Sequence, residues 1–117
     1  MATNNYTEKR PWGAFENLLD TDYCKVKEII IKPGQAPSYQ YHYKRSEVWV
    51  VTKGTGELKL DDKLTPIGPG SILHIPVEAK HQIKNTGEED LHFIEVQLGD
   101  YFGEDDIVRL EDNYGRV

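Results

Sequence analysis

Four residues at strand-like spacing could together hold a metal ion. Gln40 and His42 are two residues apart, so on a β-strand they point to the same face. A turn then leads to Glu47, which can return beside His42 on the next strand, and His81 begins a further strand-like run. Two imidazoles, one carboxylate and one amide oxygen suit zinc first, or manganese, iron, cobalt or nickel, rather than calcium. Such a set predicts one divalent ion with a position left for water or substrate, as in a catalytic site.

The residues around these ligands form short β-type runs that are separated by glycine, proline and other turn residues. Many short strands at regular spacing favour a barrel or a sandwich. Short helical turns are expected only at Asn17–Asp20 or Glu104–Leu110. The predicted strands are Lys25–Ile31, Ser38–Tyr43, Val48–Lys53, Gly56–Leu60, Ser71–Ile75, Ala79–Asn85 and Leu91–Gln97.

The bulk properties narrow the class of protein. A length of 117 residues suits one domain over residues 1–117. The net charge of −6 and the lack of a long basic run argue against nucleic acid as a partner, although a local basic cluster could still bind an anion. No apolar run approaches the roughly 18 residues of a membrane span, and no secretory signal is expected. The single cysteine, Cys24, excludes an internal disulfide and fits the cytoplasm.

Both tails have an unusual composition. They carry more large side chains than a disordered tail would, so we expect them to pack against the barrel. We also expect a homodimer through the barrel edges and the Tyr6–Glu16 arm, because small barrels commonly cover exposed edge strands by pairing. The large tail residues are Arg10, Trp12, Tyr101, Arg109, Tyr114 and Arg116.

The stretches from Gly34 to Gly54 and from Gly70 to Asn85 resemble the two signature motifs of the cupin superfamily. The spacing agrees at every step, while Gln40 stands in place of the first motif histidine and Glu78 in place of a turn glycine. The resemblance implies an all-β cupin fold, a double-stranded β-barrel or jelly roll. It also implies that the four candidate ligands share one metal ion.

A closer resemblance extends over almost the whole chain. The sequence is similar to the isomerase domain of type II mannose-6-phosphate isomerases, in which Gln-x-His is the expected first motif. This implies a metal-dependent aldose–ketose isomerase that acts on a sugar phosphate, with mannose-6-phosphate and fructose-6-phosphate as the first candidate pair. The guanylyltransferase half that often accompanies this domain is expected to be absent. The matching segments include Arg10–Gly13, Ser38–His42, Arg45–Trp49, Ile94–Gln97 and Gly103–Arg109.

The resemblance also suggests roles for basic residues. Such an isomerase moves a proton between C1 and C2, and a metal ion can stabilise the enediolate that forms. We predict Lys44, Lys27 and Arg109 as catalytic candidates, with an acid of the tail as another candidate base. Arg109, Arg116 and Lys44 are predicted to bind the phosphate, because arginine can grip it with two nitrogens. Arg45 is expected to lie in a turn as a structural or solvated residue.

Two other functional classes stay open at the level of the sequence. One is a non-catalytic sugar-binding or regulatory cupin, and the other is a cupin enzyme of another type, such as a dioxygenase or a lyase. The cupin fold alone does not choose between them, because it hosts many chemistries. The family often has histidine where Lys44 and Val48 stand, which is the difference most relevant to catalysis.

Overall fold

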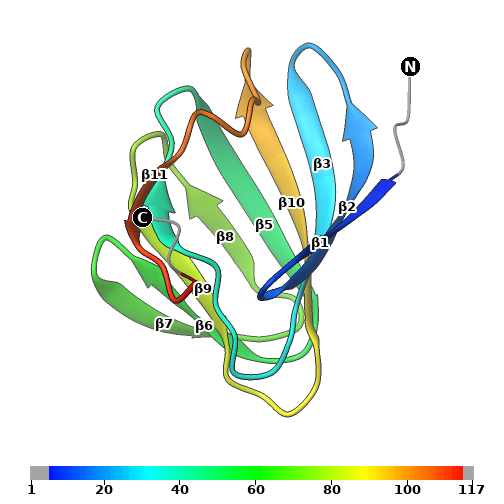
Figure 1. Ribbon diagram of the computed structural model, residues 1–117, viewed down its shortest axis with the longest axis vertical. Coiled ribbons are helices and arrows are strands. Elements are labelled where there is room, and N and C mark those ends of the chain that lie inside the picture. Colours follow the sequence, from blue (N-terminus) through cyan, green and yellow to red (C-terminus); the bar gives the residue numbers. More distant parts are fainter. Residues whose placement is uncertain (1–5, 115–117) are drawn as a thin grey trace.

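The computed structural model describes residues 6–114, and within them it contains strands and no helix (Figure 1). The prediction of an all-β fold is therefore confirmed. The strands are β1 Tyr6–Arg10, β2 Gly13–Asp20, β3 Cys24–Ile31, β4 Tyr39–Tyr41, β5 Arg45–Lys53, β6 Gly56–Leu60, β7 Lys63–Ile67, β8 Ile72–Ile75, β9 His81–Asn85, β10 Leu91–Gly99 and β11 Val108–Glu111.

These strands form two antiparallel sheets that face each other across the core (Figure 1). In the described part of the chain, a six-stranded sheet has the order β1-β2-β3-β10-β5-β8, and a five-stranded sheet has the order β11-β4-β9-β6-β7. Trp49 and Phe93 from the first sheet and Leu58 and Ile83 from the second belong to one buried hydrophobic cluster. The shared cluster holds the sheets together, because burying apolar surface is the main stabilising contribution to folding.

The interior between the sheets has an apolar end and a polar end. On β10, Leu91 and Phe93 are buried at the apolar end, whereas the next inward residues are Glu95 and Gln97. The two strands beside β10 run antiparallel to it and also change from apolar to polar inward residues, with Phe93 opposite Ile29 and Val51 and Gln97 opposite Glu47. The corresponding series are Ile31, Ile29 and Lys27 on β3, and Val51, Trp49, Glu47 and Arg45 on β5.

Each of the seven predicted runs overlaps an observed strand, and the strand Gly56–Leu60 has the predicted bounds. The expected helical turns are wrong. Residues 17–20 are the end of β2, which pairs with β3 and buries Asn17. Residues 104–110 form a turn and then the start of β11, which pairs with β4. Pairing with a neighbouring strand satisfies the backbone of both segments, and the described parts of the tails pack against the barrel as expected.

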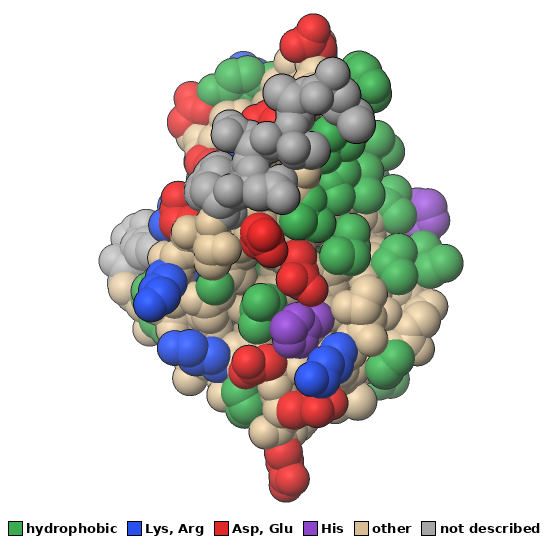
Figure 2. Space-filling view, turned by 90° about the vertical axis from the view of Figure 1, so that its right-hand side faces the viewer, with side chains coloured by type: hydrophobic (Ala, Val, Ile, Leu, Met, Phe, Trp, Pro, Cys, Tyr) green, Lys and Arg blue, Asp and Glu red, His purple; other side chains and the backbone are tan. Residues whose placement is uncertain are grey.

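The outside of the molecule is mixed in character. Figure 2 views the side on which β1, β2 and β3 lie, and there hydrophobic side chains gather toward one edge while acidic and basic side chains are interspersed below them. Among the exposed hydrophobic residues of the described chain are Tyr23 and Ile72. None of the described residues belongs to a helix that is long and apolar enough to cross a membrane.

Candidate metal centre

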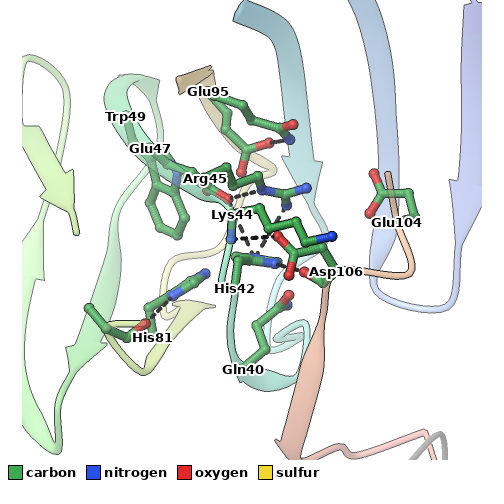
Figure 3. Close-up of polar contacts among 12 residues, drawn as sticks. Gln40, His42, Lys44, Arg45, Glu47, Trp49, His81, Glu95, Glu104 and Asp106 are labelled. Atoms are coloured by element: carbon green, nitrogen blue, oxygen red, sulfur yellow. Dashed lines mark hydrogen bonds and ion pairs between the residues drawn. The ribbon is translucent and has the colours of Figure 1, made fainter. Parts of the chain in front are cut away.

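Three of the predicted ligands form a compact, buried cluster at the polar end of the barrel. The ligand atoms of His42, Glu47 and His81 all lie within 4.8 Å of one another, and no side chain of the three is more than 4% exposed. Gln40 on β4 is the register partner of His81 on β9 and lines the same cavity. Its amide nitrogen lies 3.3 Å from the carbonyl oxygen of Ser38, which leaves the amide oxygen available as a ligand (Figure 3).

Both histidines are held in the tautomer that a metal site needs. Nδ1 of His42 lies 2.6 Å from the backbone oxygen of Asp106, and Nδ1 of His81 lies 2.9 Å from that of Ala79. A carbonyl oxygen can only accept a hydrogen bond, so each Nδ1 carries the proton and each Nε2 presents a lone pair. Burial, helped by the charge of Arg45, lowers the pKa of His42 to about 4, and burial also lowers the pKa of His81. Both rings are therefore neutral near pH 7.

The carboxylate of Glu47 is fixed by two donors. Nε1 of Trp49 donates to Oε1 over 2.8 Å, and Nε of Arg45 donates to Oε2 over 2.8 Å. Arg45 was expected in a turn as a structural or solvated residue; it is instead the first residue of β5, is only 5% exposed and has a structural contact with Glu47. The alternation of inward residues along β5 could have revealed this, because Arg45 shares the face of Glu47 and Trp49.

The donor set fits a divalent ion. Two neutral imidazole nitrogens and a fixed carboxylate converge within one cluster, and the amide of Gln40 lines the same cavity. This mixture of nitrogen and oxygen ligands suits zinc or a first-row transition metal. The residues His42, Glu47, His81 and Gln40 are thus the ones that would hold the ion.

A second carboxyl group, which was not predicted as a site residue, lies behind the ligands. Glu95 is 8% exposed, lines the cavity and accepts a hydrogen bond of 2.9 Å from Nε2 of Gln97. Burial, together with the charge of Glu47, raises the pKa of Glu95 to about 8. The sequence could have indicated that Glu95 is buried. Glu95 lies two residues after Phe93, and every second residue of β10 points inward.

The cluster opens into a cavity of about 130 Å³. Among the described residues that line it, four are basic and three are acidic, and the raised pKa of Glu95 leaves that residue largely uncharged at neutral pH. Three of the four basic side chains are ion-paired, Arg10 with Glu8, Lys27 with Glu104 and Arg45 with Glu47. The basic residues are Arg10, Lys27, Arg45 and Arg109, and the acidic ones are Glu47, Glu95 and Glu104.

The predicted basic residues occupy different places. Lys27 is buried, donates to Glu104 over 2.6 Å and lies 4.2 Å from the ring centroid of Phe15. Arg109 lines the cavity, and its buried Nε has no hydrogen-bond partner among the described residues. Lys44 is exposed, with its Nζ 4.6 Å from the ring centroid of Tyr101, and does not line the cavity. Arg116 lies outside the described residues.

Comparisons with known proteins agree with this fold. Residues 2–112 match the family described as mannose-6-phosphate isomerase C-terminal. The chain is 44% identical over 108 residues to the xanthan biosynthesis protein XanB of Xanthomonas campestris pv. campestris, covering 92% of this chain and 23% of the relative. It is 42% identical over 108 residues to a mannose-1-phosphate guanylyltransferase of Escherichia coli (strain K12), with the same coverage of 92% and 23%.

A solved structure shows the same fold. The capsular polysaccharide assembling protein CapF of Staphylococcus aureus superposes with a TM-score of 0.75 at 24% identity, over 92% of this chain and 34% of that one. Two facing antiparallel sheets, with a histidine and glutamate cluster inside one end, make this chain a cupin. Within that class, it belongs to the mannose-6-phosphate isomerase C-terminal family. It spans about a quarter of the length of the curated relatives it matches.

Proposed function

We propose that this cupin is a metal-dependent aldose–ketose isomerase of a sugar phosphate, with mannose-6-phosphate and fructose-6-phosphate as substrate and product. The observation that carries the proposal is the candidate metal cluster in a cavity that is also lined by Arg109, whose buried Nε has no hydrogen-bond partner among the described residues. The cluster could act on a carbonyl group, and the basic residues could hold a phosphate. The family match and the names of the sugar-phosphate relatives support the same substrate class.

The position of each residue in the cavity suggests its role in the proposed reaction. When bound, a divalent ion supplies a Lewis acid that polarises the sugar carbonyl and stabilises negative charge on oxygen. Gln40, His42, Glu47 and His81 would hold it. Arg109 would hold the phosphate, because its buried Nε has no partner among the described residues and a guanidinium binds phosphate well.

The proton transfer between C1 and C2 needs a group that is not itself a ligand. Lys27 lines the cavity but is paired with Glu104, and Lys44 lies outside the cavity lining. Glu95 lines the cavity and carries a carboxyl group, and it takes part in none of the ion pairs found among residues 6–114. We therefore add Glu95 to Lys27, Lys44 and Arg109 as a candidate for the catalytic role.

The first prediction is that the protein catalyses the isomerisation when it is loaded with metal. The metal-loaded protein should interconvert mannose-6-phosphate and fructose-6-phosphate and exchange solvent deuterium into C1 or C2, followed by NMR. The same protein stripped with a chelator should do neither. Binding of hexose phosphates without exchange or conversion would favour a non-catalytic sugar-binding cupin, and oxygen consumption with iron would favour a dioxygenase.

A second expected result concerns the phosphate. Arg109→Ala should weaken the binding of mannose-6-phosphate by about tenfold to a hundredfold, since a hydrogen bond to a charged group contributes roughly 1.5–3 kcal/mol. Isothermal titration of the metal-loaded protein measures this. Lys53→Ala, which removes an exposed cation of β5 outside the cavity lining, is the matched control and should bind normally. Equal effects of both changes would argue against a phosphate contact at Arg109.

The remaining expectations stay predictions. The structure places β1 at one edge of the six-stranded sheet, where the arm that was expected to form a homodimer lies. The homodimer itself, the cytoplasmic location and the single-domain organisation of residues 1–117 rest on the sequence alone.

A further inference from the structure

The guanidinium of Arg45 lies where the candidate ligands converge. Its Nε donates to Oε2 of Glu47 over 2.8 Å, and one of its terminal nitrogens lies 3.2 Å from Nε2 of His42 (Figure 3). Those two acceptor atoms are themselves 3.4 Å apart. The guanidinium thus contacts two of the atoms that a metal ion would bind.

These contacts and metal binding exclude each other at His42. The backbone oxygen of Asp106 takes the Nδ1 proton of the ring, so Nε2 has a single lone pair to offer. A lone pair that accepts an N–H of Arg45 is not available to a metal ion. The carboxylate of Glu47 has Trp49 on its other oxygen, so Oε2 is the oxygen that Arg45 and a metal ion would share.

The local environment explains why a guanidinium lies there. Glu47 is 2% exposed, and a buried carboxylate without a positive neighbour is strongly unfavourable. Arg45 supplies that neighbour, and arginine retains its charge under all ordinary conditions. Its terminal nitrogen NH1 is buried without a hydrogen-bond partner among the described residues, so the guanidinium is only partly satisfied in this position.

We infer that Arg45 competes with the metal ion for His42 and Glu47: it holds these side chains in place in the metal-free protein and is displaced toward the cavity when the ion binds. The inference rests on the proposed metal site. The cavity offers the displaced side chain space and the carboxyl group of Glu95. Arg45 is a positioning residue in this account, because it acts on the metal ion through the ligands.

The test compares metal affinity and metal-free stability. Arg45→Met removes the guanidinium and keeps an apolar stem of similar reach. It should bind Zn²⁺ or Mn²⁺ about tenfold more tightly than the unchanged protein in a chelator competition, the scale of one hydrogen bond to a charged group. Its metal-free form should unfold at a lower temperature. Arg10→Met, which removes another cavity-lining guanidinium without contact to His42 or Glu47, should leave metal affinity unchanged.

The outcomes separate this inference from the proposed metal site. If the unchanged protein binds metal and Arg45→Met binds it equally or more weakly, the competition is wrong while the metal site stands. If only Arg45→Met binds metal, the competition is supported in its strongest form. If neither binds, both ideas fail.

A measurement on the unchanged protein covers the case in which Arg45→Met does not fold. The Nε–Hε NMR signal of Arg45, assigned with Arg45→Gln, should shift on addition of Zn²⁺, because the guanidinium must leave Nε2 of His42 and its contact with Glu47 then changes. A signal that stays in place in the zinc-bound protein would overturn the inference.

Discussion

His81→Ala is expected to lower the affinity for a divalent ion by more than about a hundredfold. Losing an outer partner of a metal ligand typically costs tenfold to a hundredfold, so losing a direct ligand should cost more. His81 is 4% exposed and is fixed by the carbonyl of Ala79, so a neighbouring side chain has little room to replace it. His42→Ala should have an effect of the same size. Gln40→Ala should cost less, because an amide is the weaker ligand and water can take its place.

Elemental analysis and chelator competition on the purified variants measure the effect. His74→Ala is the matched control, because it removes an exposed histidine of β8 that is not part of the cluster. It should keep the metal content of the unchanged protein. Metal that remains at full occupancy in His81→Ala, or that disappears equally in His74→Ala, would place the ion elsewhere.

Phe93→Ala is expected to reduce the free energy of unfolding by about 3–5 kcal/mol, the usual cost of removing a large buried aromatic side chain. Phe93 is 2% exposed, and its ring centroid lies 4.8 Å from that of Trp49. Trp49 in turn donates to Glu47. The substitution should therefore also loosen the hydrogen bond that fixes a candidate ligand.

Urea unfolding of the metal-free protein measures the loss, because bound metal would add its own stabilisation. Ile94→Ala is a close control, since it removes an apolar side chain from the next residue of β10, which points to the outer face. It should cost much less than Phe93→Ala. Similar losses for the two variants would mean that the barrel core does not depend on Phe93.

The predictions that succeeded depended on short-range patterns. Alternation of side chains along a strand has a period of two, so the central strands could be located from the sequence, and Gly56–Leu60 was predicted with its observed bounds. The spacing of Gln40, His42, Glu47 and His81 indicated shared faces on those strands. The structure brings these residues to one end of the barrel.

The features that were missed depend on long-range packing. Arg45 follows Tyr43 and Lys44, a polar series that resembles a turn, and its buried charge is paired with the carboxylate of Glu47 two residues further on. β1 and β2 become strands through pairing with each other and with β3, which local propensity does not reveal. Glu78, which stands in place of a motif glycine, adopts a φ of 66° and donates its amide to the carbonyl of His42.

The contact between Asp106 and His42 makes the candidate metal centre depend on a segment that follows β10. The carboxylate of Asp106 accepts the backbone amides of Tyr43 and Lys44, and its carbonyl oxygen fixes Nδ1 of His42. A shortened version that stopped at the end of β10 would still contain all four candidate ligands. Its His42 ring would nevertheless be free to rotate and to exchange tautomers. A chain trimmed to the ligand motifs alone would thus keep the composition of the site and lose its preorganisation.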